Sequence, residues 1–435
     1  MKVLISAYSC EPGKGSEPGV GWNVAREVAK YHEVWVLTRP DESGAVIDAE
    51  LAQNPVPNLH MVYFTLPFWQ DSMRWGQSGA MQIHYYLWQI QAYFVARRLH
   101  REIKFDLVHH VTFVRHSTPS FLSLLPIPFI WGPVGGGESA PKPFWKDFSL
   151  RAKVYETARA WFRGIGERDP FTRLTVRRSA VVRATTEDTA RRLRKLGAAE
   201  VQVISETGLP EEELHRLNQY PLPASSDSIK FISMGRLLHW KGFHLGIRAF
   251  AAANLPKAEY WLCGEGPEQE RLQTLAAELG VGARVKFFGR LPRQQSLEKL
   301  GECIALIHPS LHDSGGWVCL EAMAASRPVI CLDLGGPGVQ VTDETGFKVA
   351  AETPEQAVVD LAAAMQRLAA NEDLRVQMGK AARYRVEQVF AWERVGRSLA
   401  QLYEEIKTHQ ILNSKHFQHQ PVKSEAVELQ PTKLK

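Results

Sequence analysis

Short apolar runs alternate with helical periodicity along most of the chain, and this alternation constrains the fold more than any other feature. The first run covers residues 2–7 and is followed by a Gly-rich loop and a helical pattern over 22–30. Pairs of run and helix recur until about residue 205 and resume at residue 229. Because short buried runs joined by helices are typical of βαβ units, the sequence predicts an α/β protein with mostly parallel sheets.

The length of the chain and one break in the alternation predict two domains. A chain of 435 residues is too long for one ordinary hydrophobic core. Periodicity stops over 206–228, which contains three prolines and a Ser-Ser pair and is typical of an interdomain connection. We therefore predict doubly wound domains over 1–205 and 229–389. A further helix is expected over 390–407, and the polar tail over 408–435 is expected to be disordered.

The stretch 308–338 carries the densest polar chemistry of the chain. An apolar run ends in His308, and a Gly turn then opens a short apolar helix at about Trp317. Asp313 lies in the loop and Glu321 in the middle of the helix. A Gly-rich helix start presents free N–H groups and a positive dipole end, which suit an anion. Because a carboxylate in an apolar helix needs polar partners, the stretch predicts a polar ligand.

Glycines and charged side chains also follow two other runs of the second domain. Gly235 and Arg236 follow the run over 230–234, and Lys241 comes five residues after the arginine. Glu265 and Gly266 follow the run over 258–263. A guanidinium and an ammonium beside glycines can neutralise a diphosphate, although such a segment alone is more typical of a solvated pair of basic side chains. Since ligands of such sheets bind past the carboxyl ends of strands, the three turns together favour a ligand site.

Two histidines end the run over 105–113 in the first domain. Alternation along a strand places His110 on one face of the sheet and His109 on the other. One of them is therefore expected to point towards whatever the strand end serves. On the residues alone, a structural role and a ligand-binding role for His110 remain equally open.

The distribution of charge and the number of cysteines exclude some classes of partner and of metal site. The net charge of +5 is modest, but residues 151–200 carry 13 Lys/Arg against 6 Asp/Glu. Such a basic segment suits an anionic membrane surface or an acidic substrate, and a solvated helical surface is the equally open alternative. Its arginines are not interleaved with stacking aromatics, so nucleic acid is not an expected partner. Five cysteines without a C-x-x-C pair argue against disulfides and a zinc site.

The apolar runs predict no membrane-spanning segment. The first run is too short for a signal peptide, and no run of 18 apolar residues occurs in the sequence. A cytoplasmic protein is expected, with a peripheral contact at the inner face of the membrane left open by the basic segment over 151–200.

The motifs of the second domain together resemble a known family. They are G-R-L-x-x-x-K-G over 235–242, C-G-x-G-P over 263–267 and H-P-S-x-x-D-x-x-G-W-V-C-L-E-A-M-A over 308–324. In this order they resemble the retaining glycosyltransferases of family 4 (group 1). The loop G-S-E-P-G-V-G-W-N and the turn W-G-P-V-G-G-G of the first domain resemble bacterial exopolysaccharide-type members. The resemblance implies the GT-B fold, in which two Rossmann-like domains face a cleft and the last helix, here over 390–407, packs back on the first domain.

The resemblance also implies roles for individual residues. Arg236 and Lys241 would hold the diphosphate and stabilise the leaving group, Asp313 would lie near the donor sugar, and His110 (or His109) would contact sugar or acceptor. Glu321 would accept hydrogen bonds from the ribose, and Gly21 would let its loop approach the diphosphate. The implied donor-binding set is Gly21, Gly235, Glu265, Gly266, Ser314, Gly315, Gly316, Trp317 and Glu321.

Two positions depart from the pattern of the family. Asp313 replaces the usual Glu, which shortens the carboxylate by one methylene and leaves the identity of the donor sugar open. The strand carries His-His at 109–110 where relatives commonly carry H-x-H, which leaves the role of the histidine open.

The activity implied is transfer of a sugar from a nucleotide-diphosphate-sugar donor to a saccharide or lipid-linked acceptor, with retention of configuration, for cell-surface polysaccharide or glycolipid synthesis. The resemblance implies neither metal nor cofactor, and the chain has no D-x-D motif of metal-dependent transferases. Two alternatives stay open: a sucrose- or trehalose-type synthase or phosphorylase of the same fold, and a non-catalytic nucleotide-sugar-binding protein whose site has decayed at Asp313.

Overall fold

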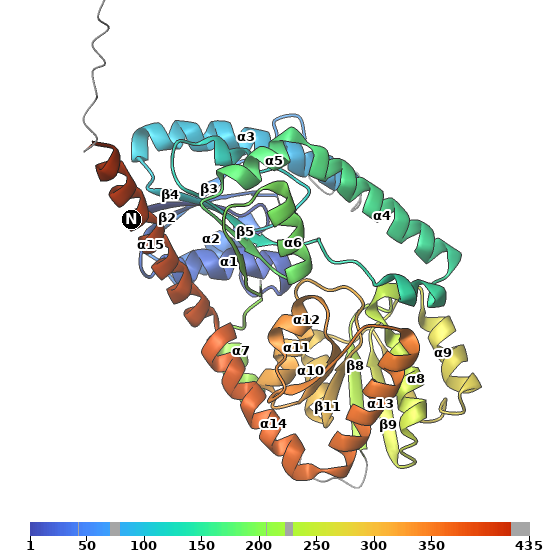
Figure 1. The fold of residues 1–435 in the computed structure, drawn as a ribbon. Helices are drawn as coiled ribbons and strands as arrows, with labels where there is room; N and C mark the ends of the chain where they lie inside the picture. Colours follow the sequence, from blue (N-terminus) through green and yellow to red (C-terminus); the bar gives the residue numbers. More distant parts are fainter. Residues whose placement is uncertain (42, 70–78, 206, 222–228, 419–435) are drawn as a thin grey trace, which may run out of the picture.

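The computed structural model describes residues 1–41, 43–69, 79–205, 207–221 and 229–418. These residues form two parallel sheets covered by helices, one above the other in the view of Figure 1. The arrangement confirms the predicted α/β class with two Rossmann-like domains.

The first sheet contains seven strands in the order β3-β2-β1-β4-β5-β6-β7, and neighbouring strands are parallel. Its first strand is apolar on both faces: Val3 and Ile5 pack in one core cluster, and Leu4 packs in another with Trp88. Such a strand requires helices on both sides of the sheet. The strands are β1 (Lys2–Ser6), β2 (Glu33–Thr38), β3 (Leu59–Tyr63), β4 (Leu107–His110), β5 (Phe129–Val134), β6 (Val181–Ala184) and β7 (Val201–Val203).

Side-chain caps begin several helices of this domain. Ser149, Asp169 and Thr186 each accept a hydrogen bond from a first-turn N–H group, which satisfies a donor that the helix itself leaves unpaired. The helices are α1 (Ser16–Val28), α2 (Gly44–Gln53), α3 (Gly79–Ile103), η1 (Phe121–Leu124), η2 (Lys142–Asp147), α4 (Leu150–Arg168), α5 (Pro170–Arg178) and α6 (Glu187–Leu196).

The second sheet contains six parallel strands in the order β10-β9-β8-β11-β12-β13. They are β8 (Ile229–Met234), β9 (Ala258–Cys263), β10 (Val285–Gly289), β11 (Ala305–His308), β12 (Val329–Leu332) and β13 (Gly346–Val349). The helices are α7 (Glu211–Asn218), η3 (His239–Lys241), α8 (Phe243–Ala253), α9 (Gln269–Glu278), α10 (Arg293–Gly301), α11 (Trp317–Ala324), α12 (Gly335–Gln340), α13 (Pro354–Ala370), α14 (Glu372–Arg385), η4 (Val386–Phe390) and α15 (Trp392–Gln418).

Three segments are more helical than predicted. Helix α7 lies in the expected connection, and its buried Leu214 and Leu217 are too few to produce a clear periodicity. Gly335 begins α12, where only a turn was expected. Helix α15 continues to Gln418, into the segment that was predicted to be disordered. That prediction rested on polar composition, which argues against burial in a core and does not argue against a helix. Residues 419–435 of the expected tail lie outside the described part of the chain.

Helix α4 connects the two domains physically (Figure 1). Just before it and at its start, Phe144, Phe148 and Ala152 are buried in the apolar core that surrounds β8 of the second domain. Towards its end, Arg163 donates hydrogen bonds to the carbonyl oxygens of Gly136 and Glu138 in the first domain. The second domain is therefore completed by a segment that precedes it in the chain by about 80 residues.

Helix α15 returns to the first domain at the end of the described chain. Its Trp392, Leu399 and Tyr403 are buried in the same cluster as Val3 and Ile5 of β1. Within the described ranges, no helix combines the length and the apolar character that crossing a membrane requires.

Candidate active site

Two adjoining cavities lie between the domains, at the carboxyl ends of the strands. Their volumes are about 390 Å³ and about 770 Å³, and we call them the smaller and the larger cavity. They form one continuous hollow, because five residues line both: Ser16, Met234, Gly235, Trp317 and Val318.

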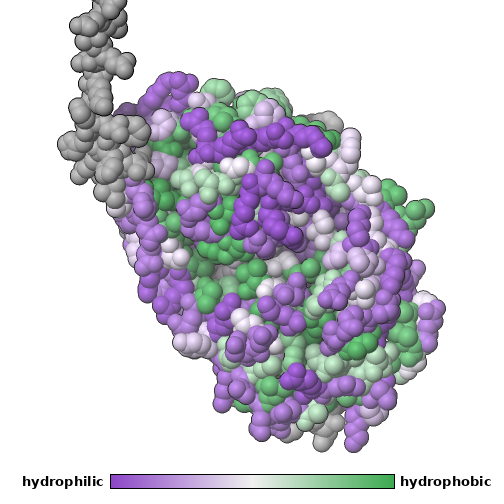
Figure 2. Space-filling model, viewed as in Figure 1, coloured by the Kyte–Doolittle hydropathy of each residue, from purple (hydrophilic) through white to green (hydrophobic). Residues whose placement is uncertain are grey.

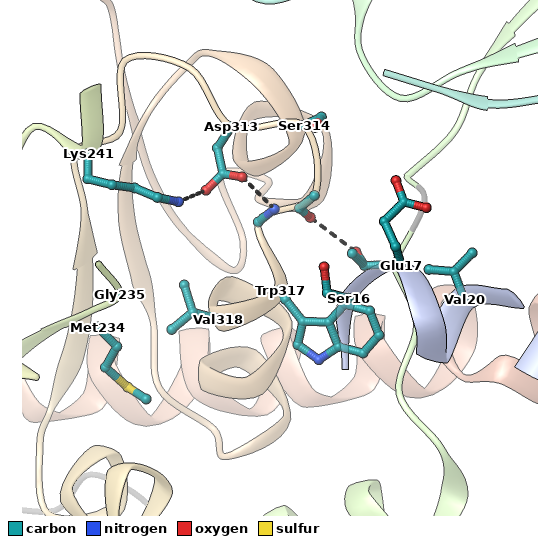
Figure 3. A pocket seen from close by; sticks show the side chains of 13 residues that line it. Ser16, Glu17, Val20, Met234, Gly235, Lys241, Asp313, Ser314, Trp317 and Val318 are labelled. Carbon is teal, nitrogen blue, oxygen red and sulfur yellow. Dashed lines mark hydrogen bonds and ion pairs between the residues drawn. The ribbon is translucent and has the colours of Figure 1, made fainter. Parts of the chain in front are cut away.

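The smaller cavity is built around an ion pair of the second domain (Figure 3). Lys241 follows β8 and Asp313 follows β11, and Lys241 Nζ lies 2.5 Å from Asp313 Oδ2. His308, the last residue of β11, places Nε2 3.2 Å from the same oxygen. Burial alone would raise the pKa of Asp313, but the Lys241 charge and the His308 hydrogen bond outweigh it and hold that pKa far below its usual range. Asp313 is therefore ionised at every physiological pH.

The start of α11 closes the wall beside this ion pair. Gly316 precedes the helix with φ +57°, and an added Cβ would lie 2.8 Å from the Gln340 side chain. Gln340 donates Nε2–H to the Gly315 carbonyl at 2.5 Å and to Thr207 Oγ1 at 2.8 Å, which holds the loop in place. The N-terminal N–H groups of α11 thus border the cavity, where they can bind an anion.

The larger cavity contains the second carboxylate of the stretch. Glu321 is buried and forms an ion pair with Arg293 of α10, which also contacts Glu213 Oε2 at 3.0 Å. Burial raises the pKa of Glu321, and the Arg293 charge offsets only part of that effect. Arg236 and Glu265 line the same cavity. The larger cavity therefore offers a buried hydrogen-bond acceptor and the guanidinium groups of three arginines, Arg236, Arg290 and Arg293.

Most of the residues predicted from the second domain line these cavities. Those that do so are Gly235, Arg236, Lys241, Glu265, Asp313, Ser314, Gly315, Gly316, Trp317 and Glu321. Four predicted residues line neither: Gly21, Gly266, His109 and His110.

The two glycines outside the cavities are required by close packing of the backbone. An added Cβ at Gly21 would lie 2.3 Å from the Ser9 carbonyl oxygen, and one at Gly266 would lie 2.4 Å from the Leu237 carbonyl oxygen. Gly21 is buried inside α1 and lines neither cavity, and its role in letting the loop approach a diphosphate stays a prediction.

Neither histidine of β4 reaches the cavities. As alternation predicts, the two side chains lie on opposite faces of the sheet, but both faces are covered. His109 Nδ1 lies 2.6 Å from Tyr403 Oη on α15, and His110 Nε2 lies 3.1 Å from the Thr112 carbonyl oxygen. Burial lowers the pKa of both histidines to about 3, so both are neutral. In this structure His110 is a buried residue that lines neither cavity, and its contact with sugar or acceptor stays a prediction.

Several lining residues were missed from the sequence. Ser16 and Glu17 lie in the G-S-E-P-G loop of the sequence motif. The motif therefore located the loop correctly, but its glycine was selected as the functional residue instead of Ser16 and Glu17. Arg293 had no signal at all, because it follows β10 by three residues in an ordinary polar helix start. Thr207 lies in the connection between the domains.

A carboxylate of α4 holds both loops that carry the ion pair. Glu156 Oε1 accepts hydrogen bonds from His239 Nε2 and from His312 Nε2, each at 3.1 Å. His239 precedes Lys241 by two residues, and His312 immediately precedes Asp313. Burial alone would raise the pKa of Glu156, but these hydrogen bonds hold it far below its usual range. The position of the ion pair is thus fixed partly from outside the second domain.

Comparison with known proteins relates the second domain to one family. Residues 218–385 match the family of glycosyl transferases group 1. The lipopolysaccharide core biosynthesis glycosyltransferase LpsD of Rhizobium meliloti is 31% identical over 196 residues, which cover 44% of this chain and 54% of that protein. The match therefore spans about half the length of that relative.

Solved structures resemble almost the whole chain. Sucrose-phosphate synthase from Thermosynechococcus elongatus superposes with a TM-score of 0.61 at 18% identity, over 94% of this chain and 99% of that one. Anabaena Alr3699/HepE in complex with UDP and glucose gives a TM-score of 0.55 at 18% identity, over 93% and 100% of the two chains. At this identity the likeness concerns the fold. The second domain thus matches the glycosyl transferases group 1 family over residues 218–385, and the described chain has the GT-B fold.

Proposed function

We propose that the protein is a retaining glycosyltransferase of family 4 that moves a sugar from a nucleotide-diphosphate-sugar donor to a saccharide or lipid-linked acceptor. An exopolysaccharide-type role in cell-surface polysaccharide or glycolipid synthesis agrees with the first-domain motifs. It also agrees with the similarity to a lipopolysaccharide core glycosyltransferase.

The observation that carries this proposal is the order of chemical groups along the continuous hollow. Glu321, buried in the larger cavity, suits the ribose hydroxyls of a nucleotide. Arg236 lines the same larger cavity, Lys241 and the start of α11 line the smaller cavity with Asp313, and these groups suit a diphosphate. The remaining space beside Asp313 is left for the sugar.

In the proposed reaction the second domain stabilises the leaving group. Negative charge develops on the diphosphate oxygen as its bond to the sugar breaks, and Lys241, Arg236 and the N–H groups of α11 are preorganised to receive it. Asp313 orients Lys241 and accepts hydrogen bonds from the donor sugar. These groups supply the required positive charge, so we propose transfer without a metal ion or cofactor.

The test begins with a thermal-shift panel of nucleoside diphosphates and nucleotide sugars, UDP and UDP-glucose included. A ligand at about 100 times its dissociation constant adds about 2.7 kcal/mol of stability. The radiolabelled form of each stabilising nucleotide sugar is then incubated with a membrane extract, with and without EDTA. We expect label in a polysaccharide or lipid fraction in both samples. Label only in a small soluble disaccharide would support the synthase alternative, and absence of any thermal shift would contradict nucleotide-sugar binding.

We also propose that α4 rests on an anionic membrane surface. The buried side of this helix carries Ala152, Glu156 and Arg163. On the opposite side the side chains of Leu150, Val154, Trp161 and Ile165 are 79%, 60%, 64% and 48% exposed. They recur at helical spacing and form one apolar stripe, and Figure 2 shows hydrophobic atoms at the molecular edge along which α4 runs.

Basic side chains flank this stripe, as expected for a helix that lies in a lipid headgroup region. They are Arg151, Lys153 and Arg168. The double variant Trp161→Glu, Ile165→Glu is expected to lower binding to phosphatidylglycerol-containing vesicles about tenfold or more, since two apolar anchors and about 1 kcal/mol of electrostatic attraction per charge change are lost. Co-sedimentation measures this, with the exposed α13 variant Val359→Glu as control. Equal binding by both variants would contradict the contact.

A further inference from the structure

We infer that Glu17 binds a hydroxyl group of the acceptor in the smaller cavity. This inference rests on the proposed transfer and assigns the acceptor side of the same site. It also limits the substrate class, because the acceptor must present a neutral, hydroxylated face at this point.

Glu17 is the charged group that the first domain contributes to the cavity. Three residues of the first domain line it, and of these Ser16 and Val20 are uncharged. The Lys241 ammonium and the helix N-terminus of the opposite wall belong to the second domain. Figure 3 shows Glu17 on the other side of the cavity from Lys241 and Asp313. A molecule that enters between the domains therefore meets a carboxylate on one side and the donor-binding groups on the other.

One carboxylate oxygen of Glu17 is held by the backbone and the other is available. Phe113 N donates a hydrogen bond to Glu17 Oε2 at 2.9 Å. Among the described residues, none forms a hydrogen bond with Oε1. A carboxylate oxygen that is positioned through its partner oxygen is suited to accept a hydrogen bond from a substrate hydroxyl.

Backbone strain surrounds this one side chain. Ser16, immediately before Glu17, has φ +61°, and Phe113, its hydrogen-bond donor, has φ +59°. Such conformations cost about 1–3 kcal/mol for residues other than glycine and persist where the surroundings enforce them, often at functional sites. The strain is explained if the two residues present the Glu17 carboxylate to a substrate.

The charge of Glu17 decides which part of the substrates it faces. A carboxylate repels a diphosphate, and the groups that suit a diphosphate line the opposite wall. Glu17 thus faces a neutral hydrogen-bond donor. In the proposed transfer the acceptor oxygen forms the new bond to the sugar carbon, the bond from that carbon to the diphosphate oxygen breaks, and the hydroxyl proton passes to the departing diphosphate. Glu17 holds the hydroxyl in position and is not the final proton acceptor.

The test separates transfer from donor hydrolysis. With the radiolabelled nucleotide sugar that stabilises the wild type, and a membrane extract as the source of acceptor, Glu17→Gln is expected to lower transfer about 10–100-fold. Hydrolysis of the same nucleotide sugar without extract and its dissociation constant should stay within about twofold of wild type. Glu11→Gln is the matched control, because Glu11 is half-buried in the same loop and lines neither cavity.

The possible outcomes distinguish the role of Glu17 from the proposed function. Transfer by Glu17→Gln equal to that of the wild type would overturn the inference while the proposed function stands. Hydrolysis and donor affinity that fall in parallel with transfer would also overturn it, because they would place Glu17 on the donor sugar. A wild type that neither binds nor uses any nucleotide sugar would instead remove the proposed function itself. Unchanged melting temperatures of both variants exclude a folding defect, and Glu17→Asp, which keeps the charge, should recover part of the transfer.

Discussion

Replacing Lys241 with alanine is expected to lower the rate of sugar transfer about 10³-fold, because one preorganised cation is lost where negative charge develops. The measurement is turnover of the radiolabelled nucleotide sugar under saturating donor. Nucleotide binding should weaken far less than turnover falls, since Arg236 and the start of α11 line the same hollow.

The variant should remain folded. Asp313 keeps the hydrogen bond from His308, and it lines the cavity, where water can hydrate its carboxylate once the ammonium is removed. Lys230→Ala is the matched control, because Lys230 forms an ion pair with Glu302 at 3.1 Å outside both cavities. A folded Lys241→Ala protein with the turnover of wild type would refute the assigned role.

Truncation after Ala391 is expected to prevent stable folding altogether. It removes the side chains of Trp392, Leu399 and Tyr403, which are at most 2% exposed and fill one face of the first sheet. Each such loss costs about 3 kcal/mol, so the sum is comparable with the about 5–15 kcal/mol that stabilises a typical domain. Loss of Tyr403 also leaves His109 Nδ1 without its partner in the core.

Soluble yield and thermal melting followed by circular dichroism measure this effect. Truncation after Gln418 serves as the control, since it leaves α15 at its full described length and should melt like the complete chain. A protein truncated after Ala391 that melts cooperatively at the temperature of the complete chain would show that α15 is dispensable.

The sequence predicted the second-domain loops well because their chemistry is local. The segment from Gly235 to Lys241 begins directly after β8, and Asp313 lies five residues after the end of β11; the carboxyl ends of parallel strands meet at one edge of a sheet. The positions of Lys241 and Asp313 after two strands of one parallel sheet were therefore enough to predict that the two residues lie at the same edge. Arg293 could not be found in this way, because its guanidinium reaches Glu321 from a helix start that carries no recognisable spacing.

The first domain was harder to predict. The periodicity of apolar residues shows that one face of a strand or helix is buried, but it does not show which element covers that face. Alternation separated His109 from His110 correctly, yet α3 and α15 cover both faces, and neither histidine lines the cavities. Likewise, Phe144 and Phe148 were recognisable as apolar, but nothing in their spacing indicated that they enter the core of the other domain. In the first loop, Gly21 was predicted to be functional. Close backbone packing explains why glycine stands at this position, and Glu17, four residues earlier, lines the cavity.

Helix α4 extends from one domain to the other, and this limits how domains can be exchanged between related proteins. A second domain excised as residues 229–389 would lack Phe144, Phe148 and Ala152, and would expose the apolar surface that they cover. It would also lack Glu156, on which the loops of Lys241 and Asp313 depend for their position. A chimera that exchanges donor specificity between relatives must therefore carry residues 140–156 together with the second domain, and the exchangeable unit is discontinuous in sequence.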